Sequence, residues 1–159
     1  MFSSWYTNYS PYDELNIDKF KPFYNYCLYL SNYVYYDNDN IISNKEYDTQ
    51  LLITINNNSL YICFRGSSSL KDWIVNLDLN LTKCTKNNKS YKIHNGFNNQ
   101  YTSVKNDIIN KISHLLNIYN INNIVITGHS LGGAIATVCS LDLIDNPLFE
   151  FLFLNQSFH

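Results

Sequence analysis

One segment of this chain constrains its fold more than any other: an apolar strand that runs directly into a glycine-rich turn and a helix. Residues 123–127 read Asn-Ile-Val-Ile-Thr, and residues 128–134 continue as Gly-His-Ser-Leu-Gly-Gly-Ala. The β-branched run is typical of a buried strand, and the small residues after the turn allow a helix to pack closely on the sheet. Such a unit belongs to α/β proteins, in which helices cover a sheet.

The remaining periodicity supports the same fold class. The expected elements are helices at 17–36, 97–119 and about 131–144, strands at 51–55, 60–64 and 123–127, and a final apolar run at 148–154. Residues 56–59, Asn-Asn-Asn-Ser, predict a hairpin turn. Strands that alternate with long helices indicate βαβ units. We therefore expect one α/β domain over residues 1–159, with a mixed, mostly parallel sheet and an antiparallel hairpin in front.

Ser130 lies in the pattern G-x-S-x-G between a strand and a helix, which is the context of a nucleophile elbow. The elbow holds its serine in a strained conformation that exposes Oγ, and a side chain at Gly128 or Gly132 would collide with neighbouring backbone. At the helix N-terminus, the amide of Leu131 would donate to an oxyanion. The alternative is a glycine-rich turn with an incidental serine, which the strand before it and the helix after it disfavour.

Rare residues gather at three places in the chain. The five glycines are Gly66, Gly96, Gly128, Gly132 and Gly133, and the single arginine, Arg65, precedes the first of them. A chain with only a structural role would not require this concentration.

Residues from about 50 to 145 resemble the class 3 lipases, the fungal-type triacylglycerol lipases of the α/β-hydrolase superfamily. Four motifs carry the resemblance: Cys-Phe-Arg-Gly-Ser-Ser-Ser at 63–69, Asp-Trp-Ile at 72–74, His-Asn-Gly-Phe at 94–97 and Ile-Thr-Gly-His-Ser-Leu-Gly-Gly-Ala at 126–134. The resemblance implies part of an α/β-hydrolase fold with Ser130 as nucleophile. It also implies that Ser67 completes the oxyanion hole with Leu131, although Ser67 taken alone is a polar turn residue.

By the same resemblance, residues 68–81 correspond to the lid of the family. Their apolar side chains recur at helical spacing: Leu70, Trp73, Ile74, Leu77 and Leu81. Such a helix could cover an apolar, acyl-binding pocket and open at a lipid surface. Periodicity alone favours a helix packed on the core, but Trp73, close in sequence to Ser67, favours a lid.

Other polar residues are interpreted as structural. Arg65 is expected to fix the oxyanion loop through carbonyls or a carboxylate, and His94 is a scaffold residue in the family. His129 occupies the variable position of the elbow, and His114 lies within an amphipathic helix.

The acid and the histidine of the family are not matched. Asp142 and Asp145 lie on or just after the helix that follows Ser130, in the wrong region for a catalytic acid, and a terminal His159 lacks an orienting acid. The pattern therefore suggests a lipase-like domain truncated after the nucleophile helix.

Two functions remain open. The first is a serine hydrolase that cleaves carboxylic, acylglycerol-type esters in lipid metabolism, with its acid and histidine supplied from outside this sequence. The second is an inactive, truncated lipase-like module with a lipid- or protein-binding role, or none. A protease or acyltransferase on the same fold has no support. The expected partners are a lipid or other ester substrate and a transient lipid-surface contact, with no cofactor or metal; the oligomeric state is left open.

Composition excludes other classes. A net charge of −2 and a pI of about 6.0 argue against a nucleic-acid partner. No signal peptide or membrane-spanning run is visible in the sequence, so we expect a cytoplasmic protein. Three cysteines, Cys27, Cys63 and Cys139, lie in apolar segments and are expected to be buried, reduced thiols, whereas Cys84 lies in a polar stretch.

Overall fold

The computed structural model describes residues 17–36, 40–67, 78, 80–86, 89–144 and 146–147. Its helices and strands, in chain order, are α1 (Ile17–Tyr33), β1 (Ile41–Asn44), β2 (Thr49–Asn56), β3 (Ser59–Phe64), β4 (Leu81–Lys86), β5 (Lys89–His94), α3 (Asn95–Ile118), β6 (Asn123–Gly128) and α4 (Leu131–Leu143). Every helix and strand predicted within the described residues is present, with ends shifted by a few residues.

The main sheet has the strand order β1-β2-β3-β6. The pairs β1–β2 and β2–β3 are antiparallel, and β3–β6 is parallel. The predicted hairpin turn is confirmed: Asn57 and Asn58 have φ of 47° and 58°, the left-handed values that a tight two-residue turn requires and that asparagine tolerates. The sheet is mixed, as predicted, but among the described strands two pairs are antiparallel and one is parallel, so the expected majority of parallel pairs is not present there. The parallel pair brings together the two segments that carry the motifs around Gly66 and Ser130.

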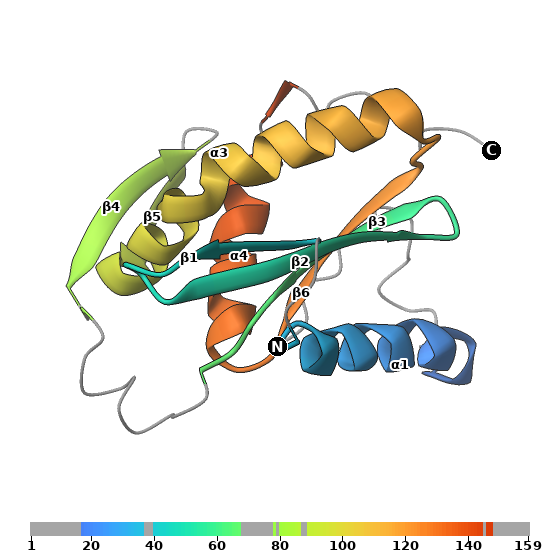
Figure 1. Cartoon of the computed structure of the whole chain (residues 1–159). Helices are drawn as coiled ribbons and strands as arrows, with labels where there is room; N and C mark the ends of the chain where they lie inside the picture. Colours follow the sequence, from blue (N-terminus) through green and yellow to red (C-terminus); the bar gives the residue numbers. More distant parts are fainter. Residues whose placement is uncertain are drawn as a thin grey trace.

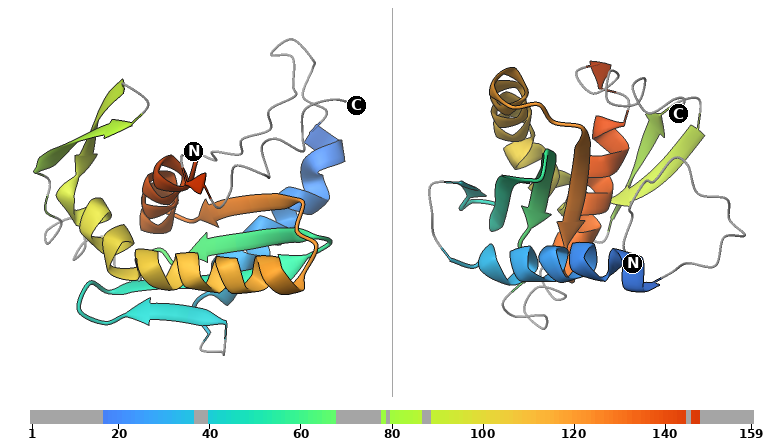
Figure 2. Two further views of the ribbon diagram at one scale, coloured as in Figure 1. Left: turned by 90° about the horizontal axis from the view of Figure 1, so that it is seen from above. Right: turned by 90° about the vertical axis from the view of Figure 1, so that its right-hand side faces the viewer.

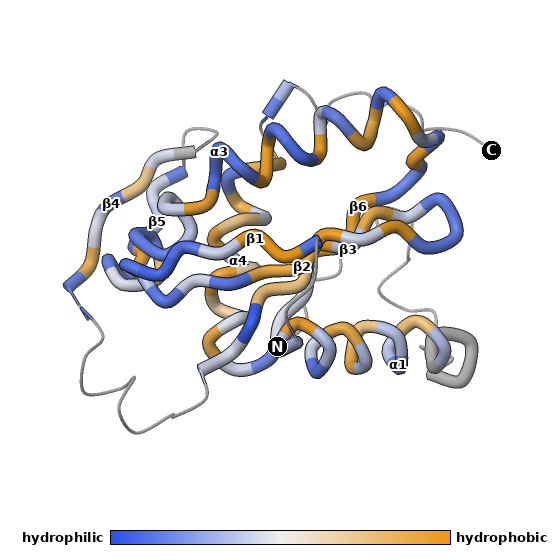
Figure 3. The backbone as a smooth tube through the Cα atoms, viewed as in Figure 1, coloured by the Kyte–Doolittle hydropathy of each residue, from blue (hydrophilic) through white to orange (hydrophobic). Residues whose placement is uncertain are grey.

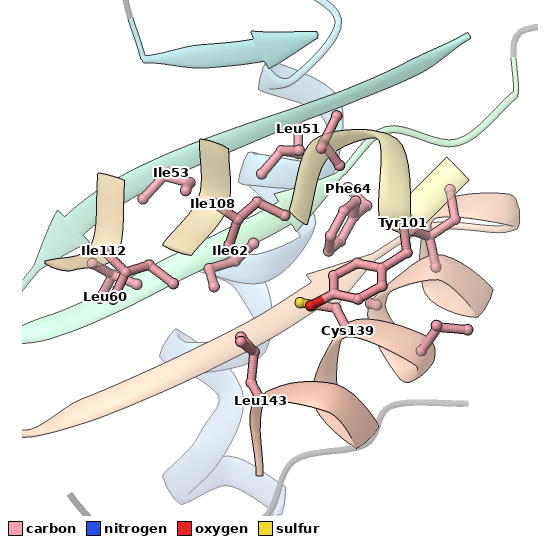
Figure 4. Close-up of a cluster of buried hydrophobic side chains, with 14 of the residues drawn as sticks. Leu51, Ile53, Leu60, Ile62, Phe64, Tyr101, Ile108, Ile112, Cys139 and Leu143 are labelled. Atoms are coloured by element: carbon pink, nitrogen blue, oxygen red, sulfur yellow. The ribbon is translucent and has the colours of Figure 1, made fainter. Parts of the chain in front are cut away.

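Helices cover both faces of this sheet (Figures 1 and 2). On one face, α3 and α4 form the larger core with the sheet, which includes Leu51, Ile62, Phe64 and Ile108 and is shown in Figure 4. The other face is covered by α1, whose buried residues join Leu52, Tyr61 and Cys63 of the sheet in a second cluster. The central strands are therefore buried on both faces, which explains their nearly continuous apolar runs.

The long helix α3 is amphipathic, as its sequence predicts. Its fully buried residues include Tyr101, Val104, Ile108 and Ile112, at the spacing that places side chains on one face. In Figure 3, hydrophobic and hydrophilic residues alternate turn by turn along this helix. The helix lies across the sheet and leads the chain back to begin β6 beside β3.

Three strands are not predicted by the sequence patterns. The short β1 contributes only two apolar residues, Ile41 and Ile42, and none of its residues is fully buried. Strands β4 and β5 pair antiparallel in a separate two-stranded sheet, and their lysine-rich, mostly exposed residues lack a clear apolar face. A strand that buries little has little reason to carry the hydrophobic alternation by which strands are recognised.

The predicted lid helix lies largely outside the described residues, as does the apolar run at 148–154. One part of that prediction is wrong: Leu81, expected as the last apolar residue of the helix, is the first residue of β4 and is 53% exposed. Within the described ranges, no helix has the length and hydropathy needed to cross a membrane.

Candidate active site

Two loops leave the sheet side by side at the carboxyl ends of β3 and β6. The parallel register pairs Phe64 with Gly128, so residues 65–67 and residues 129–131 start from neighbouring positions. A Cβ placed on Gly66 would lie 2.7 Å from the carbonyl oxygen of His129, which shows that the loops are in direct contact. The carboxyl ends of parallel strands are the usual place for binding and catalytic groups in α/β proteins.

Ser130 has the strained geometry that the elbow pattern predicts. Its φ is 54° and its ψ is −121°, a combination that non-glycine residues rarely adopt and that costs about 1–3 kcal/mol. The residue is exposed, and its side chain makes no capping hydrogen bond to α4. The hydroxyl is therefore presented at the surface of this edge.

The glycines of the elbow allow neighbouring backbone segments to approach one another closely. A Cβ on Gly128 would lie 2.4 Å from the carbonyl carbon of Gly132, and one on Gly132 would lie 2.3 Å from the carbonyl oxygen of Phe64. No described glycine has a positive φ, so the unusual backbone conformation falls on Ser130 itself. The collisions expected from the sequence are present, and they fix the first turn of α4 against both β6 and β3.

Leu131 and Ser67 are the residues from which backbone donors are expected at this edge. Among the first amides of α4, those of Gly132 and Gly133 donate to the carbonyls of His129 and Ser130 at 2.9 and 3.0 Å. Leu131 is the first residue of α4, and its side chain is buried in the core. Because the first amides of a helix lack partners within it, the Leu131 amide is free for a ligand oxygen to the extent that the described residues show. Ser67 is half-buried and directly follows Gly66 in the adjacent loop.

Arg65 contacts a carboxylate, as expected from the sequence. Its guanidinium forms an ion pair with Asp48 at 2.5 Å, and its amide donates to the carbonyl of Gln50 at 2.9 Å. The guanidinium also lies 6.0 Å from the centre of the Tyr35 ring. Sequence reasoning missed Asp48 and Tyr35, and no local pattern marks either residue.

The described histidines lie on other elements or at the edge of the turn. His94 is the N-cap of α3, and its ring packs edge-to-face on Phe97 at 5.7 Å, which agrees with a scaffold role. His114 is exposed on α3, and His129 is exposed beside Ser130. His159 lies outside the described residues.

Asp142 is bound within the α3–α4 interface, as expected for a residue in the wrong region for a catalytic acid. The Tyr101 hydroxyl donates to its carboxylate at 2.8 Å, and the Lys105 ammonium lies 2.7 Å away. Burial raises the pKa of Tyr101, and the nearby Cys139 and Asp142 raise it further. Figure 4 shows Tyr101 pointing from α3 toward Cys139 of α4. Asp145 lies outside the described residues.

The cysteines are distributed as predicted. Cys27, Cys63 and Cys139 are buried, Cys84 is half-buried, and all four are free thiols. Burial raises the pKa of Cys63 to about 12 and also raises the pKa of Cys27 and of Cys139. Thiols whose ionisation is suppressed in this way are poor nucleophiles, so Ser130 is the better nucleophile candidate.

The predicted acyl-binding residues of the lid, Leu70, Trp73, Ile74 and Leu77, lie outside the described residues. Within the described part of the chain, no group of three His, Cys, Asp or Glu side chains could hold a metal ion.

A sheet covered on both faces, with a strained serine between its carboxyl edge and a helix, is the nucleophile-elbow arrangement of the α/β-hydrolase fold. The family model described as Lipase (class 3) matches residues 61–157. This chain therefore belongs to the class 3 lipase family.

Individual relatives agree with this assignment. A lipase from Rhizomucor miehei is 35% identical over 99 residues, which cover 61% of this chain and 27% of the relative. Phospholipase A(1) DAD1 from Arabidopsis thaliana is 29% identical over 111 residues, 60% of this chain and 25% of the relative. The solved structure of Rhizomucor miehei triacylglyceride lipase superposes with a TM-score of 0.64 at 25% identity, over 82% of this chain and 57% of that one. The chain thus spans about a quarter of the length of these curated relatives.

Proposed function

We propose that this chain carries the nucleophile and the oxyanion donors of a lipase-type serine hydrolase that cleaves carboxylic esters. The observation that carries the proposal is the strained, exposed Ser130, whose turn is in van der Waals contact with the loop that leads to Ser67. Retaining a backbone conformation this costly is typical of a functional site. A purely structural turn could relax it by placing glycine there.

In the proposed reaction, Ser130 Oγ attacks the ester carbonyl while a histidine takes its proton and an acid orients that histidine. The carbonyl oxygen becomes an oxyanion, which the amides of Leu131 and Ser67 stabilise together with the N-terminal dipole of α4. The alcohol leaves with the proton from the histidine, and water then releases the acyl group from Ser130. Asp142 does not provide the acid, because Tyr101 and Lys105 hold it at the α3–α4 interface.

The relatives support a proposal for the substrate class. The Rhizomucor miehei relative is a triacylglyceride lipase and the Arabidopsis relative is a phospholipase A(1), so the proposed substrates are acyl esters of glycerol. The apolar residues at 70–77 support a contact with lipid surfaces, as a lid would make.

The proposal is tested by labelling the full-length protein with a fluorophosphonate, which reacts with activated serines. We expect labelling of the native protein and complete loss in Ser130→Ala. Ser113→Ala is the matched control, because it removes a half-buried serine hydroxyl that bonds within α3, and it should label normally. Hydrolysis of a dissolved short-chain ester and of an emulsified triacylglycerol then separates esterase from lipase activity.

Two outcomes would contradict the proposal. A folded native protein that is not labelled and cleaves neither ester would favour the inactive, lipase-like module. Labelling that persists in Ser130→Ala would assign the reactive serine elsewhere.

A further inference from the structure

The carboxyl end of α1 reaches the active-site edge of the sheet. Most of α1 covers the opposite face of the sheet, where Cys27, Leu30 and Val34 are buried. The next residue, Tyr35, belongs to the turn that ends the helix, and its side chain is 42% exposed. Its ring lies against Arg65, and its hydroxyl lies against Gly66. A residue from the first helix thus contacts the loop formed by residues 65–67, which we call the oxyanion loop.

Gly66 of the oxyanion loop is crowded by both the elbow and Tyr35. A Cβ placed there would lie 2.7 Å from the carbonyl oxygen of His129 and 3.1 Å from the hydroxyl of Tyr35. The elbow and Tyr35 therefore both lie in the Cβ direction of Gly66 and leave little free space beside this residue. Ser67, the proposed oxyanion donor, is the next residue.

Arg65 connects the same loop to the rest of the sheet. Its amide donates to the carbonyl of Gln50, which extends the β2–β3 ladder by one bond beyond the Leu51–Phe64 pair. Its guanidinium contacts the carboxylate of Asp48 and also lies 6.0 Å from the centre of the Tyr35 ring. Because the Asp48 side chain is 75% exposed, this ion pair adds little to global stability.

From these contacts we propose that Tyr35 is a positioning residue, which holds the oxyanion loop against the elbow through Gly66 and Arg65. This inference rests on the proposed function, because it assigns Ser67 to the oxyanion hole. An oxyanion donor is effective only when it is held in place before the charge develops. Loosening the loop therefore lowers the rate of acyl transfer and leaves substrate binding largely unchanged.

Three variants of the full-length protein separate the parts of this contact. Tyr35→Phe removes only the hydroxyl at Gly66, and Tyr35→Leu also removes the ring at Arg65. Tyr29→Leu is the matched control, because Tyr29 is an exposed tyrosine of α1 that stacks on Tyr26 and Tyr33. Each variant is first checked for a native thermal midpoint.

Hydrogen exchange of the oxyanion loop is the readout that does not depend on activity. We expect the amides of residues 65–67 to exchange about tenfold faster in Tyr35→Leu, as for a locally opened segment, while the amides of α3 are unchanged. Tyr35→Phe should show a smaller change, and Tyr29→Leu none.

Ester hydrolysis is the second readout. Removal of an oxyanion donor lowers kcat about 100- to 1000-fold, so a loosened donor in Tyr35→Leu should lower kcat about tenfold with little change in KM. If Tyr35 acts through Arg65, the double variant Tyr35→Leu/Asp48→Asn should lower kcat by a smaller factor than the product of the factors for the two single variants.

The outcomes distinguish this inference from the proposed function. Unchanged exchange in Tyr35→Leu would overturn the inference, and so would faster exchange that leaves kcat unaltered in an active enzyme. If the native protein hydrolyses no ester, the proposed function fails and, with it, the assignment of Tyr35 to oxyanion positioning.

Discussion

At the scale of single residues, the active-site edge depends on where side chains are absent. Ser130 carries the strained backbone, while Gly128 and Gly132 let the elbow, α4 and β3 approach one another closely. Their neighbour Gly133 is less confined, because its nearest contact to a built Cβ is 3.2 Å, to the carbonyl oxygen of Gly128. Two adjacent glycines of one helix thus differ in how much space the surrounding backbone leaves for a side chain.

This difference predicts unequal effects of the same substitution at the two positions. Gly132→Ala should lower the free energy of unfolding by about 1–3 kcal/mol, because its Cβ would meet the backbone of Phe64 and force α4 away from β3. The free energy of unfolding of Gly133→Ala should be within about 1 kcal/mol of the native value. The cost of a small displacement of the neighbouring backbone is offset by the better helix propensity of alanine. Urea unfolding of both variants measures this, and equal losses would contradict the assigned contacts.

At the scale of elements, α3 and α4 are joined by polar contacts at Asp142 as well as by apolar packing. Asp142 accepts a hydrogen bond from Tyr101 and pairs with Lys105, and Tyr101 itself is 2% exposed. A buried hydroxyl without a partner is costly, so this carboxylate stabilises the packing of α4, the helix that follows Ser130.

Substitutions at Asp142 should separate packing from catalysis. Asp142→Ala leaves the Tyr101 hydroxyl without its acceptor and should cost about 1–3 kcal/mol. Asp142→Asn keeps an acceptor oxygen and should cost less. Thermal unfolding measures both, and fluorophosphonate labelling of Asp142→Asn should match the native rate. A labelling rate lowered by orders of magnitude in folded Asp142→Asn would instead identify Asp142 as the catalytic acid.

At the scale of the whole molecule, the buried thiols make the free energy of unfolding decrease as the pH rises into the alkaline range. Burial raises the pKa of Cys63 from 9.0 to about 12, and it raises the pKa of Cys27 and Cys139 in the same direction. Above pH 9 the unfolded chain therefore releases protons that the folded chain retains, so unfolding becomes more favourable as pH rises. The stabilising contribution is complete below pH 9 and is lost progressively toward pH 12.

Urea unfolding at two pH values checks this linkage. From Cys63 alone, the free energy of unfolding should fall by about 2 kcal/mol when the pH is raised from about 8 to about 10.5. Cys63→Ala should lose stability less steeply over that interval, although it starts from a lower value because a buried side chain is truncated. Parallel pH profiles for the two proteins would contradict the raised pKa.

The elbow could be predicted from sequence because its requirements are local. A β-branched strand, a serine and glycines at fixed offsets each reflect a backbone constraint within a few residues. The same holds for α3, whose apolar face is predicted by the spacing of its apolar residues, and for the Asn57–Asn58 turn. The role of Ser67 came from the family resemblance, and the lid residues 70–77 remain a prediction.

The sequence by itself thus determined the α/β class, the position of the elbow and the identity of its strained serine. Only the tertiary structure decided what surrounds it: Tyr35 and Asp48 on the oxyanion loop, Tyr101 and Lys105 on Asp142, and Leu81 in a strand. These contacts join residues from different elements, or depend on pairing with another strand. The periodicity of a sequence does not predict such contacts. A local pattern encodes the backbone of one segment, whereas a contact between segments exists only once the sheet and its helices have been assembled.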